Sequence, residues 1–486
     1  MNAFDYFFEK TSELDKNFLV GKENLSFREL YNSSLDLAGY LEREFGRNKN
    51  ILLLSVNNRF FLIAYFAIIK SGNVCIPLDP NIEKENLDFI SGLTNPVIIF
   101  LTRDIERKIA VGETRRITPD TIANDEFKVR IAEKGGEYDE NNCAEIIFTS
   151  GSTGVPKGVM VSHKNLMANT GSIITYLKLS QDDRMLVVLP FYYCYGLSLL
   201  HTHLRVGGSI VFNNSFIFIG GIMRDLLEQK CTGFAGVPSH FQILLRKSDN
   251  FKTTRFPDLR YVTQAGGKLA PIFIDEFKRS HPEITFIVMY GQTEATARLS
   301  YLPPELYEAK KGSMGKGIPG VELKVVNEKG EKIKPGEIGE VIARGDNIML
   351  GYFGDEEGTR NTIRDGWLYT GDIGTVDKDD YIYLTARKKE IIKVGGKRIS
   401  PKEIEAVILE IPEVVDCTIE GVEDELLGEA LKATVVIRPE NGKESMVERI
   451  KHHCSMHLAL YKVPQVFELK EQLVISATGK KIKGKL

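Results

Sequence analysis

The sequence lacks the features that mark membrane-embedded or secreted proteins. Its longest apolar candidate, residues 60–70, falls short of the roughly 18 to 20 residues that a membrane span needs. The N-terminal segment 1–18 has no basic stretch followed by an apolar one, so it does not resemble a signal peptide. The six cysteines include no C-x-x-C pair, which argues against disulfides and zinc sites. We therefore expect a cytoplasmic protein with no membrane span.

A strong charge of either sign is also absent. The net charge is −3 over 486 residues, so no global field attracts the chain to nucleic acid or anionic lipid. The lysine-rich C-terminal stretch has no interleaved aromatic residues, and we expect no nucleic-acid partner. A hydrophobic content of 43% and a charged content of 27% are typical of a globular protein, and the length allows two or three domains.

Apolar runs alternate with helical patterns over the first part of the chain. Strands are expected at 51–56, 74–78, 97–101, 185–189, 209–212, 259–264 and 284–289, and a helix at 60–70. Strand, helix and strand in this order predict an α/β fold whose sheets are covered on both faces. Past residue 315 the pattern changes to short strands at 320–327, 339–344 and 380–384, which predict a small β-barrel.

A polar break at Ala386–Glu390 separates these strands from a compact α+β unit. In that unit Ser400 and Glu403 are expected to form a capping box, with Pro401 at the first helical position. We predict a large N-terminal domain at 1–388 and a smaller, mobile C-terminal domain at 389–486, with a hinge near Lys389.

The most informative stretch is the polar loop between two apolar runs at 146–161. Its hydroxyls, bare backbone N–H groups and lysine are the groups that bind a polyphosphate, and its glycines let the backbone approach closely. The candidate phosphate-binding residues are Thr149, Ser150, Gly151, Ser152, Thr153, Gly154 and Lys157.

An ordinary P-loop and a plain polar turn are the alternatives to this reading. A P-loop needs Gly-Lys-Ser/Thr followed at once by a helix, whereas here Pro156 precedes Lys157 and Gly158 follows it. Both flanks of the loop read as short strands, so a hairpin laid over a phosphate chain is favoured. A bare turn does not explain a T-S-G-S-T-G run ending in P-K-G.

Three further motifs carry side chains suited to a nucleotide. Tyr290–Glu294 follows an expected strand, where a ligand lies in many α/β sheets; Tyr290 could stack on a base and Glu294 could bind Mg²⁺. Asp372 could accept two hydrogen bonds from a ribose, and Arg387 could add a donor. Lys480 follows a glycine near the C-terminus and could act as a mobile cation. Each motif alone also fits a turn, a cap or a frayed tail.

Together these motifs resemble the AMP-forming superfamily of acyl-CoA synthetases, luciferases and peptide-synthetase adenylation domains. The loop 149–158, Tyr290–Glu294, Tyr369–Asp372, Arg387 with Lys393–Gly396, and Gly479-Lys480 occur in the order and at roughly the spacing of that family. The resemblance covers nearly the whole chain and is strongest to stand-alone acyl-CoA synthetases. It implies that a carboxylic acid reacts with ATP, releases pyrophosphate, and passes as an acyl group to a thiol.

The resemblance also implies roles for individual residues. Thr149–Lys157 would hold the β- and γ-phosphates, Tyr290 would stack on adenine, and Thr293 would touch the α-phosphate. Glu294 would bind Mg²⁺, Asp372 and Arg387 the ribose, and Lys480 would bridge the carboxylate and the α-phosphate. Also expected at the nucleotide are Gly266, Gly267, Gly291 and Gln292, and expected at the acyl group are Tyr193 and Gly196. Rotation about Lys389 would then bring the loop with Gly395 and Gly396 to the thiol.

The acid and its acceptor stay open at this point. Segment 190–199 is aromatic and apolar and contains no Asp or Glu to pair with an amino group, so an aryl or aliphatic acid is favoured over an α-amino acid. Tyr193 stands where acyl-CoA synthetases often carry histidine. The acceptor is expected to be CoA, and the alternative is the phosphopantetheine thiol of an acyl carrier protein. A pseudo-enzyme is disfavoured because Lys480 and Glu294 are both present.

Several patterns are expected to carry no function. Gly315–Gly320 matches G-x-G-x-x-G, but it follows no strand and Pro319 suits a turn. The pairs His201/His203 and His453/His457 lack the further ligands of a metal frame, so structural or surface roles are expected.

Overall fold

The computed structural model describes most of the chain. The described residues are 1–108, 114–122, 127, 138–149, 155–216, 218–394, 397–424, 428–438 and 443–470. Ser150–Gly154, Gly395, Gly396 and Lys480, all named above as candidate site residues, lie outside them. Within the described part, no helix combines the length and the apolar character that crossing a bilayer would require.

The first layer is a seven-stranded mixed sheet. Its strands, in spatial order, are β18 (Gly351–Tyr352), β8 (Lys157–Ser162), β7 (Cys143–Thr149), β4 (Val74–Leu78), β3 (Asn50–Leu54), β5 (Ile98–Leu101) and β6 (Arg115–Ile117). The central strands are continuous apolar runs because both of their faces are covered. Helix α3 (Arg59–Lys70) follows β3 and is almost completely buried, which explains why it is apolar on every side.

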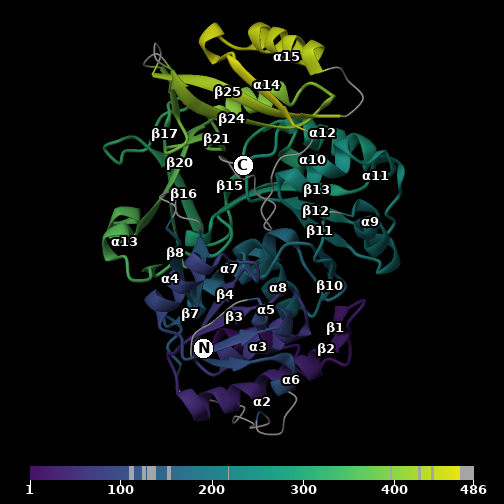
Figure 1. The fold of residues 1–486 in the computed structure, drawn as a ribbon, viewed down its shortest axis with the longest axis vertical. Helices are drawn as coiled ribbons and strands as arrows, with labels where there is room; N and C mark the ends of the chain where they lie inside the picture. The colour runs from purple at the N-terminus through teal and green to yellow at the C-terminus, as the bar shows by residue number, and fades with distance from the viewer. Residues whose placement is uncertain are drawn as a thin grey trace.

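A second, nine-stranded sheet lies beside the first (Figure 1). Its order is β15 (Lys316–Gly317), β14 (Ser300–Leu302), β13 (Thr285–Tyr290), β12 (Tyr261–Gln264), β11 (Gly233–Gly236), β9 (Arg184–Val187), β10 (Ser209–Phe212), β1 (Asn17–Val20) and β2 (Leu25–Ser26). From β13 to β1 the strands run parallel, so their carboxyl ends lie at one edge. The seven strands expected in the first part of the chain all occur in these two sheets, and the expected α/β fold is confirmed.

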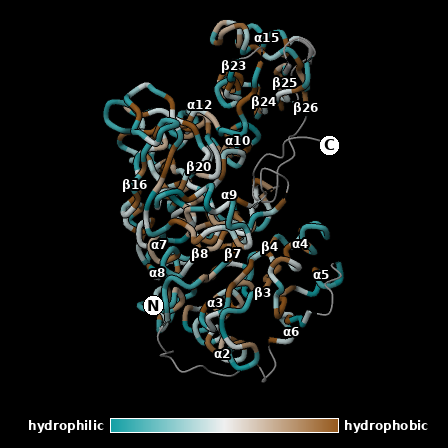
Figure 2. The backbone as a smooth tube through the Cα atoms, turned by 90° about the vertical axis from the view of Figure 1, so that its left-hand side faces the viewer, coloured by the Kyte–Doolittle hydropathy of each residue, from teal (hydrophilic) through white to brown (hydrophobic). Residues whose placement is uncertain are grey.

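Helices connect and cover these two sheets. Those of the large unit are α1 (Ala3–Phe8), α2 (Phe27–Phe45), α4 (Lys84–Thr94), α5 (Arg103–Glu106), α6 (Pro119–Ile122), α7 (His163–Leu177), α8 (Cys194–Val206), α9 (Ile219–Glu228), α10 (Pro238–Arg246), α11 (Asp249–Thr253) and α12 (Pro271–Ser280). The most apolar segments of the backbone gather along the strands β3, β4, β7 and β8 in the interior (Figure 2). One large cluster of buried residues joins the helices to both sheets.

The segment expected as a small barrel forms a five-stranded antiparallel sheet. It contains β16 (Val321–Val326), β17 (Gly339–Gly345), β20 (Trp367–Val376), β19 (Ile363–Arg364) and β21 (Ile382–Arg387), with α13 (Glu356–Thr362) before β19. The C-terminal unit follows, with β22 (Ile392–Val394), β23 (Lys397–Ile399), α14 (Pro401–Ile408), β24 (Val414–Asp424), β25 (Gly428–Ile437), α15 (Lys443–His457) and β26 (Val466–Lys470). This unit lies at the top of Figure 1, above α10 and α12.

The capping box expected at the start of α14 is wrong. Ser400 occupies the N-cap position, but its side chain makes no capping bond; its hydroxyl donates instead to the carbonyl oxygen of Thr385. Glu403 accepts from the ammonium of Lys462 at 2.6 Å. A tertiary partner for each side chain therefore replaces the local pair. Pro401 does lie in the first turn, as expected.

A buried arginine joins the large unit to the C-terminal unit. Arg246, at the end of α10, is 4% exposed. Its Nη1 donates to the carbonyl oxygens of Ile411, Pro412 and Val414 at 3.1, 2.8 and 2.8 Å, and its Nε donates to Glu276 Oε2 at 2.9 Å. The guanidinium thus holds the chain between α14 and β24 against α10 and α12.

Candidate active site

The two strands expected on either side of the candidate phosphate loop are present. β7 and β8 pair antiparallel, with Thr149 opposite Lys157 and Phe148 opposite Gly158. A Cβ at Gly158 would lie 2.8 Å from Ile146 Cγ2, and a side chain there would disturb the hairpin. The strand flanks that separate this loop from a P-loop are confirmed.

Lys157 has a carboxylate partner that the sequence did not reveal. Its Nζ lies 2.7 Å from Asp355 Oδ2 and 4.6 Å from the centre of the Tyr352 ring. The hydrogen bond from Lys157 lowers the pKa of Asp355, and a second bond comes from the backbone N–H of Gly358 at the start of α13. Asp355 is 198 residues from Lys157, so no local motif could have signalled the pair.

The Tyr290–Glu294 segment leaves the carboxyl end of β13 and turns sharply. Gly291 fits because a Cβ there would come within 2.0 Å of the carbonyl oxygen of Ala297. Thr293 begins a 3₁₀ turn, and its hydroxyl lies 3.5 Å from Cys194 Sγ at the first residue of α8. The turn thus touches α8.

Three residues expected at the adenosine come together. Asp372 is 5% exposed; its Oδ2 accepts from the Tyr290 hydroxyl at 2.6 Å and its Oδ1 accepts from Arg387 Nε at 2.9 Å. The pairing of β20 with β21 places Asp372 opposite Arg387. The carboxylate raises the pKa of Arg387, and burial raises that of Tyr290. Asp372 keeps lone pairs for hydroxyl donors such as those of a ribose.

Glu294 is linked to the phosphate lysine through Tyr352. The Tyr352 hydroxyl donates to Glu294 Oε1 at 2.9 Å, and the ring of the same tyrosine lies beside Lys157. The Glu294 side chain is partly exposed, so it can reach a bound cation. A carboxylate oxygen beside a polyphosphate is a donor that Mg²⁺ accepts. The carboxylate of Glu294 and the nearby ammonium of Lys157 therefore fit the magnesium complex of a nucleotide.

Tyr193 and Gly196, expected at the acyl group, lie at the N-terminal end of α8, and Gly266 and Gly267, expected at the nucleotide, lie near the start of α10. A Cβ added to Gly266, which has φ +81°, would lie 2.9 Å from both the Tyr193 hydroxyl and Val237 Cγ1. A Cβ on Gly267 would lie 3.3 Å from Pro238 Cγ. Gly196 is required by packing, because its Cβ would meet the carbonyl oxygen of Pro190 at 2.2 Å.

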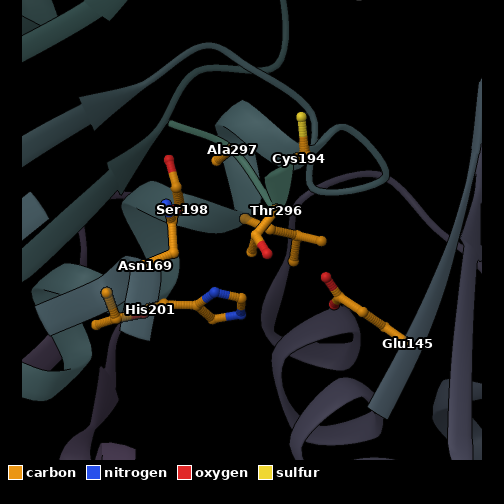
Figure 3. A pocket seen from close by; sticks show the side chains of 9 residues that line it. Glu145, Asn169, Cys194, Ser198, His201, Thr296 and Ala297 are labelled. Carbon is orange, nitrogen blue, oxygen red and sulfur yellow. The ribbon is translucent and has the colours of Figure 1, made fainter. Parts of the chain in front are cut away.

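A small cavity lies beside Thr296 and Ala297, just after the 3₁₀ turn Thr293–Ala295 (Figure 3). It is lined by Glu145, Asn169, Thr170, Cys194, Leu197, Ser198, His201, Thr296 and Ala297. The Tyr65 hydroxyl donates to Glu145 Oε2 at 2.7 Å and lies 2.7 Å from His201 Nε2. Burial raises the pKa of Glu145 to about 7 and lowers that of His201 to about 3. His201 is a buried residue of this network, so its expected structural role is confirmed.

The buried Glu145 predicts a pH-dependent stability. Its pKa is raised from 4.5 to about 7, so its contribution to stability is complete below about pH 4.5 and is lost as the pH rises through about 7. The loss amounts to about 3 kcal/mol, from 1.36 kcal/mol per pH unit. Glu145→Gln stays neutral and is expected to unfold at higher urea than the wild type at pH 8, with the two nearly equal at pH 5. Glu448→Gln, at an exposed glutamate, serves as the control. An equal pH dependence in Glu145→Gln would refute the prediction.

The pair His453/His457 was expected to lack further metal ligands, and this expectation is wrong. Glu410, His453 and His457 each place a possible ligand atom within 4.8 Å of the others, with His453 Nε2 3.1 Å from the exposed Glu410. Glu410 is 43 residues from His453, so the spacing of the histidines alone could not reveal it.

His203 and the glycine-rich segment 315–320 behave as expected. His203 is buried, with Nδ1 at 2.9 Å from the Leu199 carbonyl oxygen. Lys316–Gly317 form an edge strand, and the turn at Gly320 leads into β16 and not into a helix.

Comparison with known families decides the identity of this fold. The model of the AMP-binding enzyme family matches residues 8–353, and that of the AMP-binding enzyme C-terminal domain matches residues 403–480. The chain belongs to the AMP-binding enzyme family. It is an AMP-forming acid–thiol ligase of the acyl-CoA synthetase type.

Individual relatives agree with this assignment. The chain is 29% identical to an oxalate–CoA ligase of Arabidopsis thaliana, over 95% of this chain and 92% of the relative. It is also 29% identical to a 2-succinylbenzoate–CoA ligase of Bacillus licheniformis, over 96% and 95%. Among solved structures, ATP-bound MatB of Rhodopseudomonas palustris superposes with a TM-score of 0.88 at 26% identity, covering 99% of this chain and 97% of that one.

A second solved structure supports the fold. The anthranilate CoA ligase AuaEII, in complex with anthranoyl-AMP, superposes with a TM-score of 0.89 at 24% identity, covering 99% of this chain and 95% of that one. The agreement over nearly the full length of both chains matches the expected combination of a large α/β unit with a C-terminal unit.

Proposed function

We propose that the cluster of Tyr290, Asp372, Arg387, Glu294 and Lys157 holds ATP for attack by a carboxylic acid, and that the acyl group then passes to CoA. The convergence of four separate chain segments on one site carries this proposal. In this proposal Tyr290 stacks on the base, Asp372 and Arg387 bind the ribose, and residues 149–157 bind the β- and γ-phosphates.

The chemistry follows from the charge that develops in the reaction. A carboxylate oxygen attacks the α-phosphorus, and the bond from that phosphorus to pyrophosphate breaks. Negative charge gathers on the phosphate oxygens, so cations placed in advance lower the barrier. Mg²⁺, when bound at Glu294, would neutralise phosphate charge. In this proposal Thr293, whose hydroxyl lies 3.5 Å from Cys194 Sγ on α8, contacts the α-phosphate.

The second half-reaction needs the thiol at the acyl carbonyl. The thiol sulfur attacks that carbon, the bond to AMP breaks, and the sulfur proton leaves to solvent or a basic group. We assign CoA as the acyl acceptor because the relatives named above are CoA ligases. A carrier-protein phosphopantetheine thiol is the alternative acceptor. The cysteines of the described chain are all free thiols, which suits a cytoplasmic enzyme.

Rotation of the C-terminal unit about a hinge would let one site serve both half-reactions. The proposed domains are 1–388 and 389–486, with Lys389 as the hinge and the segment with Gly395 and Gly396 delivered to the thiol path. β21 ends at Arg387 and β22 begins at Ile392, so Lys389 lies in the short connection between the two units.

Lys389→Pro tests this hinge. Proline fixes φ near −65° and restricts the preceding residue, so the backbone change needed for rotation is hindered. ATP–pyrophosphate exchange is expected to stay within about two-fold of wild type, while thioester formation slows at least about ten-fold. Lys389→Ala keeps a free backbone and is the control. Equal loss of both half-reactions in the proline variant would rule out a hinge at this position.

One experiment tests the function as a whole. Pyrophosphate release is measured over a panel of carboxylic acids, with CoA, with a carrier protein bearing phosphopantetheine, and with neither. Acid-dependent release that rises on addition of CoA supports the proposal. Release stimulated only by the carrier protein selects the alternative acceptor, and no acid-dependent release would overturn the assignment.

A further inference from the structure

Arg298 is a buried cation for which the described part of the chain provides no carboxylate partner. It lies between the 3₁₀ turn Thr293–Ala295 and β14, and it is 2% exposed. Its Nη1 donates to the carbonyl oxygen of Ala297 at 3.2 Å and its Nη2 to the Ser198 hydroxyl at 3.4 Å, while its Nε has no partner. Among the described residues, no Asp or Glu forms an ion pair with it.

A comparison within the same chain shows that this arrangement is unusual. Arg246 is buried to a similar degree, and it pairs with Glu276 and with three carbonyl oxygens. A buried charge costs several kcal/mol unless an opposite charge and hydrogen bonds compensate for it. Arg298 has two hydrogen bonds at the long end of the range, a further hydrogen bond to the Tyr176 hydroxyl and one aromatic face. All of these partners are neutral, so its charge is less well compensated than that of Arg246.

The guanidinium is located beside the candidate acyl site. Its central carbon lies 3.9 Å from the centre of the Tyr195 ring, and the Tyr195 hydroxyl bonds to Thr263 on β12. Tyr193 and Tyr195 are in ring contact, and the charge of Arg298 opposes the rise that burial causes in the pKa of both. The cation therefore contacts α8 through Ser198 and Tyr195, and Tyr195 in turn connects it to β12.

The position of Arg298 along α8 sets the length of a fitting ligand. Cys194 touches Thr293 at the reacting end, and Ser198, which touches Arg298, is one helical turn further on. Four residues of helix correspond to about 6 Å along the axis. Among short aliphatic dicarboxylic acids, extended glutaric and adipic acids have carboxyl groups separated by roughly this distance, and succinic acid is shorter.

We propose that Arg298 binds a second carboxylate of the acid substrate, so that the enzyme activates one end of a short dicarboxylic acid. This inference rests on the proposed function. One carboxylate attacks the α-phosphorus and displaces pyrophosphate, and the other stays ionised in a charge-assisted bond to the guanidinium. The thioester product retains that free carboxylate, and AMP leaves. Aromatic walls from Tyr193 and Tyr195 enclose the carbon chain between the two ends.

Matched acid pairs test the proposal. ATP–pyrophosphate exchange is measured with succinate against butyrate, glutarate against pentanoate, and adipate against hexanoate. The wild type is expected to have kcat/KM at least about ten-fold higher for the dicarboxylic member of its best pair. Arg298→Met is expected to lower that value about 100-fold while the monocarboxylic member is unchanged or improved.

Two further variants keep the result decisive. Arg298→Lys retains the charge without the planar fork and is expected to keep the order of preference with about ten-fold lower kcat/KM. If Arg298→Met does not fold, the test is made with Arg298→Lys instead. Arg205→Gln removes a half-buried arginine elsewhere on α8, paired with Glu9, and is expected to leave the preference unchanged.

The possible failures are distinguishable. Exchange by the wild type that is equal for both members of every pair, or higher for the monocarboxylic member, overturns the assignment of Arg298. An equal loss for both members in Arg298→Met does the same. Absence of exchange with every acid would overturn the proposed function.

Discussion

Lys480→Ala is expected to abolish adenylation while ATP still binds. Lys480 is the proposed bridge between the carboxylate and the α-phosphate, where charge develops only as the bond forms. Removing one donor of this kind lowers kcat by about 100- to 1,000-fold. The adenosine contacts at Asp372 and Tyr290 are untouched, so ATP affinity should change little.

The neighbouring lysine provides a matched control for this test. Lys481→Ala removes the same charge one position further on and is expected to keep at least half of the wild-type exchange rate. The measurements are ATP–pyrophosphate exchange and equilibrium binding of ATP. Unchanged exchange in Lys480→Ala would refute the assignment, and strong loss in Lys481→Ala alone would move the catalytic role to Lys481.

Arg246→Met is expected to destabilise the docking of the C-terminal unit. The change leaves Glu276 without its cation and the carbonyl oxygens of Ile411, Pro412 and Val414 without a donor. Breaking a buried pair by removing one partner costs about 3–5 kcal/mol. The chain around α14 should therefore become accessible, and limited proteolysis there should accelerate at least about ten-fold.

A double variant separates the lost pair from lost packing. Arg246→Met combined with Glu276→Leu removes both charges, so part of the stability lost in the single variant should return. Arg205→Met removes an ion pair to the half-exposed Glu9 and a hydrogen bond to the carbonyl oxygen of Tyr6, and it should cost less than Arg246→Met because its carboxylate partner stays in contact with water. Unfolding in urea and proteolysis at one temperature give both values. If Arg246→Met were as mild as Arg205→Met, the junction would not depend on this residue.

The sequence predicted those parts of the fold that depend on short-range pattern. Apolar runs such as β3 and β4 are visible because a strand buried on both faces must be apolar along its length. The phosphate hairpin and the Tyr290–Glu294 turn are contiguous in sequence, so their chemistry can be seen before the chain is folded. The capping box at Ser400 shows the limit, because a tertiary acceptor on Thr385 competed successfully with the local partner.

Side chains that meet only after folding were not predictable from one sequence. Asp355 reaches Lys157 across 198 residues, and Tyr352 joins Glu294 across 58. Glu145 in β7 looked like an ordinary strand residue, because its partner Tyr65 lies on a helix 80 residues earlier. The separation between partners, and not the chemistry of the residues, decided which parts of the site were missed.

The pair formed by Lys157 and Asp355 has a consequence for turnover. If the phosphates of ATP bind Lys157, they must compete with a carboxylate that already occupies it at 2.7 Å. ATP binding is then weakened by the free energy needed to separate Lys157 from Asp355. The same carboxylate can pair with Lys157 again when pyrophosphate leaves. Asp355 would act as a built-in competitor, which weakens the hold on the first product and favours its escape before the thiol arrives. Because Asp355 also caps α13, each exchange of partner would be felt at the start of that helix.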